Sequence, residues 1–391
     1  QRDLSVGDPR AIAWNASGTV AYVAGMGSNN LVAVDSAGTR LARIELGEGP
    51  TGMALDNARG IGYVLNRFDG SLSVIDLAGP TETDRVPFFD PTPAAIRQGR
   101  VHLYGTHEGS GLGQIACASC HVDARTDRLS WDLGNPAGVM ESRNGFDFHP
   151  MKGPFKTQSL QDIIGVPAMH HRGDRDDLFG FAGAFEGLQG DDAPLDNASM
   201  SKFEAFLDTI HFGPNPNRNI DNSLSTTVPI PGPNGTVRGF GDAVAGLDSY
   251  LTGDNTSSRC VNCHQGPRSR SDVLDVSTGF ILDQALLAET FSGFYDRIGM
   301  FRTSADGSTS GFGFRPDGAQ SSEFIHRNRN FPLGTESGTH IFAFQLSIEG
   351  PLPELPGLSR DAHAGVGQQV TLDAGSDTAT LSRLTQLMLS L

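Results

Sequence analysis

Two five-residue units contain all four cysteines of the chain. They are Cys117-Ala-Ser-Cys120-His121 and Cys260-Val-Asn-Cys263-His264. Two thiols at this spacing can form thioethers with the two vinyl groups of one porphyrin, and the imidazole that follows can then bind the iron. The sequence therefore predicts two covalently attached c-type haems, with His121 and His264 as proximal ligands of the iron.

Two other chemistries use paired cysteines. One zinc ion can be held by separated cysteine pairs and histidines, and Cys-x-x-Cys also occurs in thioredoxin-like redox sites. Two complete five-residue units favour haem over both alternatives. With every cysteine used in these units, none is left for a disulfide.

Charge and hydrophobicity exclude other classes of protein. The net charge of −16 argues against non-specific nucleic-acid binding, which needs a basic surface. It favours partners with a basic docking patch, such as small electron carriers. No apolar run approaches the roughly 20 residues that cross a bilayer, so no membrane span is predicted.

Two segments at the start of the chain resemble each other. Residues 9–35 align without gaps with residues 50–76, so that Tyr22 pairs with Tyr63. Each segment has short apolar runs separated by turn residues, which is typical of antiparallel strands. A period of about 40 residues suggests β-propeller blades, although two blades cannot close a propeller, and a small sheet packed on the next domain is the alternative.

After residue 90 the pattern becomes helical. Helices are expected over residues 93–103, 199–211, 242–251 and 379–391, with a Pro/Asn/Gly-rich linker over residues 214–235. We therefore divide the chain into a partial β-propeller over residues 1–90, a first haem domain with its linker over residues 91–235, and a second haem domain over residues 236–391.

From residue 90 onward, several segments resemble the bacterial di-haem cytochrome c peroxidase and MauG superfamily, in the branch with a YVTN-type propeller before the cytochrome part. In order, they are Gly99-Arg100 and Tyr104 before the first haem motif, Trp131-Asp132-Leu133-Gly134-Asn135-Pro136, Lys156-Thr157-Gln158-Ser159-Leu160, His170-His171-Arg172-Gly173-Asp174-Arg175, Pro214-Asn215-Pro216 and, after the second motif, Gly311-Phe312-Gly313-Phe314. The resemblance implies a mixed but mainly α fold: two cytochrome c-like domains, preceded here by the propeller blades.

The resemblance also implies an activity. Relatives reduce hydrogen peroxide, or use it to oxidise another protein, and pass electrons between two haems. It further implies a calcium ion between the haem domains, and either a small electron-donor protein or a protein substrate as partner. The alternative is a di-haem electron-transfer module without substrate chemistry, attached to a surface propeller that binds a partner.

Three residues are candidates for catalysis by this resemblance. His171 occupies the position of a tryptophan that lies between the haems in many relatives, and Trp131 is the other aromatic near the first motif. Glu186 is the candidate acid–base group, in a segment that also contains Gln189. The alternatives are core packing for Trp131, an exposed carboxylate for Glu186, and a structural role for either His170 or His171.

The two haems are expected to differ in their distal ligands. Relatives place the reactive haem in the first cytochrome domain, so the haem at His121 is expected to bind peroxide. Pro316 replaces a histidine found in relatives after the second motif. His326 is therefore the leading distal ligand for the second haem, and Met300 is the alternative.

Haem attachment by thioethers implies a bacterial periplasmic, cell-surface or extracellular location. The first residues carry no signal peptide, so an exported protein would already have lost it. Because the repeat begins in register at residue 9 and the last predicted helix runs to residue 391, the natural chain is expected to be longer at both ends.

Overall fold

The computed structural model describes residues 2–143, 146–151, 153–166, 169–213, 215–219, 223–231, 236–252, 264, 287, 290–297 and 336–348. The predicted site residues Cys260, Cys263, Met300 and His326, and the predicted helix over residues 379–391, lie outside this part of the chain. Unit 1 comprises Gln1–Asp127, Gln158–Ile164 and Asp177–Ile210, and unit 2 comprises Arg128–Thr157, Gly165–Asp176 and His211–Leu391. The predicted domain boundaries near residues 90 and 235 stay predictions.

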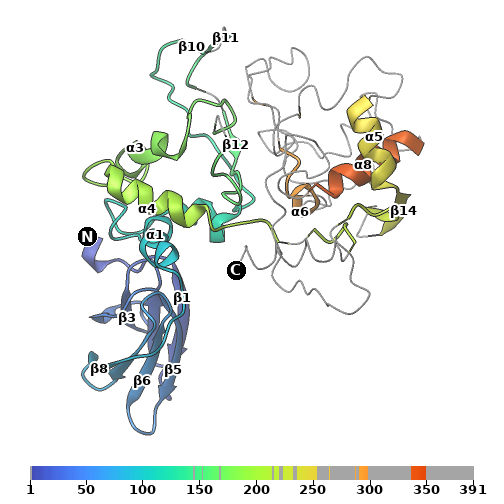
Figure 1. The fold of residues 1–391 in the computed structure, drawn as a ribbon. Helices are drawn as coiled ribbons and strands as arrows, with labels where there is room; N and C mark the ends of the chain where they lie inside the picture. The colour runs from blue at the N-terminus through green and yellow to red at the C-terminus, as the bar shows by residue number, and fades with distance from the viewer. Residues whose placement is uncertain are drawn as a thin grey trace. The chain divides into compact units, whose positions relative to one another are not determined.

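Unit 1 begins, after a short 3-10 helix η1 (Arg2–Leu4), with two four-stranded antiparallel sheets, the blue ribbons of Figure 1. Blade 1 has the order β1 (Pro9–Trp14), β2 (Val20–Gly25), β3 (Asn30–Asp35) and β4 (Arg40–Glu45). Blade 2 has the order β5 (Pro50–Asp56), β6 (Ile61–Asn66), β7 (Ser71–Asp76) and β8 (Thr81–Pro87). Strands β5, β6 and β7 begin at the residues that the sequence repeat aligns with the starts of β1, β2 and β3, and β8 follows β4 at the same spacing, just beyond the aligned segments. Both sheets are β-propeller-like meanders.

The two blades share one hydrophobic core. Blade 1 contributes buried side chains that include Tyr22, Leu31 and Ala33, and blade 2 contributes Val64 and Ile75. Because side chains alternate between the faces of a strand, each blade presents only one of its two faces to the other.

Two crossing helices follow the blades in unit 1. They are α1 (Ala94–Tyr104) and α4 (Asn197–Leu207), and they confirm the helices predicted over residues 93–103 and 199–211. The Asp196 carboxylate caps α4 by accepting from the backbone N–H groups of Ala198 and Ser199. A Cβ at Gly99 would collide with the Lys202 carbonyl of α4, so glycine permits this close crossing. The shorter elements of unit 1 are α2 (Cys117–Cys120), α3 (Ala182–Gly187) and the 3-10 helices η2 (Val122–Ala124) and η3 (Leu178–Phe181).

The described part of unit 2 combines short strand pairs with three helices. The antiparallel pairs are β9 (Ser130–Trp131) with β12 (Phe155–Lys156), β10 (Glu141–Arg143) with β11 (Phe146–Phe148), and β13 (Val228–Pro231) with β14 (Val237–Gly241). The helices are α5 (Ala243–Thr252), which confirms the helix predicted over residues 242–251, α6 (Phe294–Arg297) and α8 (Glu336–Leu346). The predicted linker over residues 214–235 therefore contains a strand, β13.

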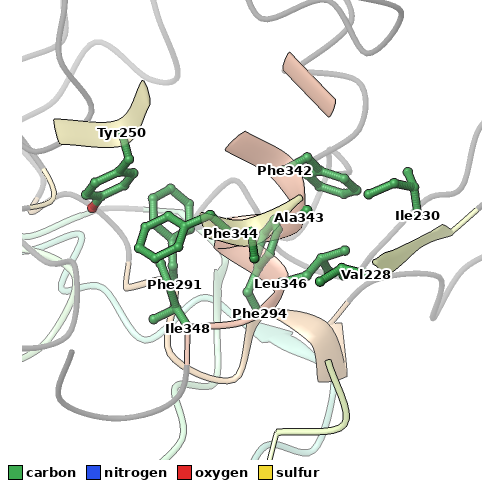
Figure 2. Close-up of a cluster of buried hydrophobic side chains, with 11 residues drawn as sticks. Val228, Ile230, Tyr250, Phe291, Phe294, Phe342, Ala343, Phe344, Leu346 and Ile348 are labelled. Atoms are coloured by element: carbon green, nitrogen blue, oxygen red, sulfur yellow. The ribbon is translucent and has the colours of Figure 1, made fainter. Parts of the chain in front are cut away.

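An aromatic core joins these helices to β13. Its buried side chains include Tyr250, Phe291, Phe294, Phe342 and Phe344, and Figure 2 shows how they gather around α8. A Cβ at Gly246 would collide with the His340 carbonyl, so α5 and α8 cross closely at this glycine. This packing holds α5 in place, and α5 comes just before the second Cys-x-x-Cys-His unit in the sequence.

The predicted fold class, a mixed but mainly α di-haem cytochrome of two cytochrome c-like domains, is wrong. Within the described residues, strands outweigh helices and form five antiparallel sheets. Two of the described α-helices, α2 and α6, are single turns of four residues. Helix content was overestimated because isolated short strands leave no long alternating pattern in the sequence.

Candidate functional site

The first haem motif forms a single helical turn in unit 1. Cys117 and Cys120 begin and end α2, so their side chains lie three residues apart on one side of the turn. The His121 backbone N–H donates to the Cys117 carbonyl at 2.8 Å, and the Ala116 N–H donates to Ser119 Oγ at 3.0 Å. Both ends of the turn are therefore held, and two thiols and one imidazole come from a rigid five-residue segment.

The His121 imidazole is oriented by a backbone acceptor. Its Nδ1 lies 2.8 Å from the Gln158 carbonyl oxygen. A carbonyl can only accept, so Nδ1 carries the proton and, in the neutral ring, Nε2 carries the lone pair. This is the usual arrangement of a histidine that binds a metal through Nε2. Gln158 lies in the Lys156–Leu160 segment of the resemblance, but its contribution comes from the backbone.

The segment after His121 is held in an unusual backbone conformation. Asp123 and Ala124 have φ of 49° and 61°, in the left-handed region. The Asp123 carboxylate accepts from Arg10 Nη2 at 3.2 Å and from the Tyr104 hydroxyl at 3.4 Å. Burial raises the pKa of Tyr104 to about 12, and the Asp123 charge adds to this shift. Strand β1 and helix α1 thus both hold the bend that follows the predicted iron ligand.

Gln189 meets the first cysteine. Its Nε2 lies 3.5 Å from Cys117 Sγ, and its buried Oε1 has no hydrogen-bond partner in the described part of the chain. Burial raises the pKa of the Cys117 thiol to about 11 and also raises the pKa of Cys120. A redox-active Cys-x-x-Cys pair uses the thiolate, which these raised pKa values disfavour.

Several exposed apolar side chains lie close to the first motif, or to Gln189, in the sequence. The exposed ones nearest to it in sequence, or next to Gln189, are Leu112, Ile115, Val122 and Leu188. A porphyrin needs apolar contacts, its two thioethers need two thiols, and its iron takes the adjacent imidazole as a ligand. The donor set, the unpartnered Gln189 oxygen and the exposed apolar residues fit a covalently bound haem.

His264, the one described residue of the second motif, has different contacts in unit 2. The Tyr250 hydroxyl, from α5, donates to the His264 backbone carbonyl at 2.6 Å. The His264 ring stacks on the Phe291 ring, with centroids 4.3 Å apart and an interplanar angle of 29°. These two contacts connect the predicted iron ligand to the aromatic core of Figure 2.

Trp131 and His171 both contact strand β12 in unit 2. Trp131 in β9 pairs with Phe155, and its side chain is exposed. His171 is buried, its Nε2 lies 3.0 Å from the Lys156 carbonyl, and its ring lies 4.9 Å from that of Phe155. His170 instead pairs with Asp174 at 3.0 Å, and this contact helps to lower the pKa of Asp174 against the effect of burial. The two adjacent histidines thus have separate partners.

Glu186 and Gln189 lie on different sides of the segment that contains them. Glu186 is exposed on α3, whereas Phe185 and Gln189, four residues apart, are buried. Gln189 is therefore the side chain that approaches the first motif, whereas the sequence favoured Glu186 as the candidate acid–base group. The catalytic role of Glu186 stays a prediction.

Within the described residues, no group of three or more histidine, cysteine, aspartate or glutamate side chains could hold a metal ion. The predicted calcium ion therefore has no candidate ligand cluster in this part of the chain. In the same part, no helix has the length and hydrophobicity to cross a membrane.

No protein-family model and no curated protein matches this sequence. Among solved structures, hydrazine synthase from Kuenenia stuttgartiensis is similar at 18% identity over 22% of this chain and 25% of its own, with a TM-score of 0.21. Apo AztD from Citrobacter koseri is similar at 19% identity over 21% of this chain and 23% of its own, with a TM-score of 0.19. The chain thus spans about a quarter of each of these two structures. Kuenenia stuttgartiensis hydrazine synthase pressurised with xenon matches 66% of this chain and 88% of its own, at 16% identity and a TM-score of 0.40. All three TM-scores are below 0.5, so these likenesses define neither fold nor activity.

Proposed function

We propose that this chain is a di-haem c-type cytochrome. One haem would be attached to Cys117 and Cys120 with His121 as axial ligand, and the other to Cys260 and Cys263 with His264 as axial ligand. The observation that carries the proposal is the fixed tautomer of His121, whose Nδ1 donates to the Gln158 carbonyl and leaves the lone pair on Nε2.

A bound haem would supply one-electron chemistry at its iron. The chain's own residues would set the conditions for it. The Gln158 carbonyl would make the His121 ring a stronger donor, since a hydrogen bond at Nδ1 raises the basicity of Nε2. Gln189 would offer a polar contact beside the Cys117 attachment, and Phe291 would shield one face of the His264 ring.

We further propose a peroxidase or peroxide-driven oxidase activity in an exported bacterial protein. This proposal rests on the resemblance of residues 90–391, with Glu186, His171 and Trp131 as the catalytic candidates. Hydrogen peroxide would be one partner, and a small electron donor or a protein substrate the other. The acidic net charge of −16 supports a partner with a basic docking patch.

Haem content is the first test. The pyridine haemochrome assay on protein expressed with an export signal and the bacterial cytochrome c maturation system should give two c-type haems per chain, retained in denaturing gels. Zinc in place of iron would contradict the proposal.

The spectra then separate an enzyme from an electron carrier. We expect one high-spin and one low-spin haem in the oxidised protein, with only the high-spin signal changed by peroxide. His326→Ala should convert the low-spin signal to high-spin, and Met300→Ala is the matched variant for the alternative ligand. Two low-spin haems that do not respond to peroxide would instead identify an electron-transfer module.

A further inference from the structure

The Gln158 carbonyl that accepts from the His121 ring lies in a short segment of unit 1. Residues Gln158–Ile164 form one of the three stretches of this compact unit, which also contains the first haem motif. A carbonyl orients a ring only if its own peptide group is held in place, and this peptide group joins Gln158 to Ser159. Whatever fixes the chain at Ser159 therefore fixes the acceptor of the His121 proton.

Backbone hydrogen bonds tie this segment to the bend that follows His121. The Leu160 N–H donates to the Ala124 carbonyl at 2.8 Å, and the Ala124 N–H donates to the His121 carbonyl at 2.9 Å. Ala124 is 1% exposed and has a φ of 61°. The predicted iron ligand and the segment that orients it are thus joined twice, through the His121 ring and through Ala124.

The Ser159 side chain closes the same segment into a tight turn. Its Oγ accepts from the Gln161 N–H at 3.2 Å, a local turn in which a serine hydroxyl bonds to the backbone two residues ahead. The single hydroxyl proton can go to Gln161 Oε1 at 3.2 Å or to the Ala124 carbonyl at 3.4 Å. Both acceptors belong to buried residues, so loss of the hydroxyl is costly.

Ser159 is the position in this turn at which a substitution can change the orientation of the carbonyl. Gln158, Leu160 and Ala124 contribute backbone atoms, which a substitution leaves in the chain. Alanine at position 159 would instead remove the hydroxyl from all three of its contacts. The turn over residues 159–161 would then lose its internal hydrogen bond, and the peptide group before it could rotate away from the His121 ring.

We propose that Ser159 is a positioning residue for the first haem, because its hydroxyl holds the turn that presents the Gln158 carbonyl to the His121 ring. This inference rests on the proposed haem at Cys117 and Cys120 and adds the side chain that controls the donor strength of its axial histidine. A hydrogen bond at Nδ1 makes the imidazole a stronger donor, and a stronger donor stabilises ferric over ferrous iron. Ser159 would therefore lower the reduction potential of the first haem relative to a chain without this hydroxyl.

Ser159→Ala in the full haem-loaded chain tests the proposal. Its first haem should have a higher reduction potential, and the His121 Nδ1 proton, followed by NMR of the ferric protein, should exchange with solvent several-fold faster than in the parent chain. Ser159→Thr keeps a hydroxyl that can form the same turn and should restore both values. Ser201→Ala removes an exposed hydroxyl that donates to the Asn197 carbonyl at 3.0 Å, and it should change neither value.

The haem content of each protein separates the possible failures. Cys260→Ser with Cys263→Ser, which should retain the first haem alone, assigns the signals. A parent chain without covalent haem would overturn the proposed function and this inference with it. Two haems per chain, with the potential and the exchange rate unchanged in Ser159→Ala, would overturn the role of Ser159 alone, even if urea unfolding shows lower stability. So would a change that Ser159→Thr does not reverse, because it would come from altered packing and not from the hydroxyl.

Discussion

The two haem motifs share a five-residue pattern, but the structure holds their histidines by different means. At His121 the contact is made to the ring itself, through Nδ1 and the Gln158 carbonyl. At His264 the contacts are made to the backbone carbonyl by the Tyr250 hydroxyl and to the ring face by Phe291. The first arrangement specifies a tautomer, whereas the second specifies a position and an apolar face.

Because of this difference, the two sites depend on different interactions for their properties. A carbonyl hydrogen bond changes the donor strength of the imidazole, so the first site depends on local polar geometry. Stacking on a residue of the hydrophobic core makes the second site depend on the packing of α5, α6 and α8. Substitutions at and around the two sites test this contrast, from the largest expected effect to the smallest.

The largest effect is expected from removing the attachment cysteines of one motif at a time. Cys117→Ser with Cys120→Ser should reduce the haem content from two to one per chain, because a site without thiols cannot form thioethers. Cys260→Ser with Cys263→Ser is the matched variant and should also leave one haem. Comparing the two spectra would assign the high-spin and low-spin signals to the two motifs. Loss of both haems in either variant would show that the sites are not independent.

Phe291→Ala tests the dependence of the second site on the core. Truncating a buried phenylalanine to alanine typically lowers the free energy of unfolding by about 3–5 kcal/mol. Here the substitution also removes the ring that stacks on His264. Urea unfolding should show the destabilisation, and the spectrum of the second haem should change while the first is unaffected.

The control for this prediction is Phe342→Ala. Phe342 is as buried as Phe291, and its ring packs edge-on against Phe294 at 5.9 Å. It should therefore lower stability by a similar amount with a smaller spectral change. Equal spectral changes in the two variants would show that stacking on His264 has no specific effect.

The fold was predictable where the sequence repeats itself or where a helix has a continuous pattern. The alignment of the two repeats located the equivalent strands of both blades, because each repeat encodes the same turns and the same alternation. Strand β13 was missed because its sequence Val-Pro-Ile-Pro contains two prolines, which cannot donate to a sheet and are typical of linkers. It nevertheless pairs with β14 and contributes Val228 and Ile230 to the aromatic core.

The candidate site was predictable at its cysteines and histidines and much less so around them. The hydrogen-bond partner of the His121 ring is a backbone carbonyl distant in the sequence. Every residue type has a backbone carbonyl, so residue identity could not predict this contact. Gln189 lies beyond the end of α3, so helical spacing does not single it out over Glu186, and the turn that buries it has no residue-type signal in the sequence.

Asp123 tests the bend after His121. Its φ of 49° is costly for alanine, so Asp123→Ala should lower the free energy of unfolding by about 1–2 kcal/mol. Asparagine tolerates this conformation and keeps an acceptor for Tyr104, so Asp123→Asn should lose much less, and Asp123→Gly should lose only the side-chain contacts. Urea unfolding measures each loss, and only the first haem should respond in the spectrum. An unchanged stability in Asp123→Ala would show that the bend is not strained.

The smallest effect is expected from the titration of Tyr104, which has its hydroxyl on Asp123 and its ring 5.4 Å from that of Phe68. Burial, followed by the Asp123 charge, raises its pKa from 10.0 to about 12. Between these two values the folded chain retains a proton that the unfolded chain has lost, so the stabilisation is complete below pH 10 and declines as the pH rises towards 12. The free energy of unfolding should therefore fall more steeply over this interval in the parent chain than in Tyr104→Phe. In the near-ultraviolet difference spectrum of the two proteins, one tyrosinate should appear near pH 12. If it appears near pH 10 instead, Tyr104 is open to solvent, and its hydroxyl does not connect α1 to the bend.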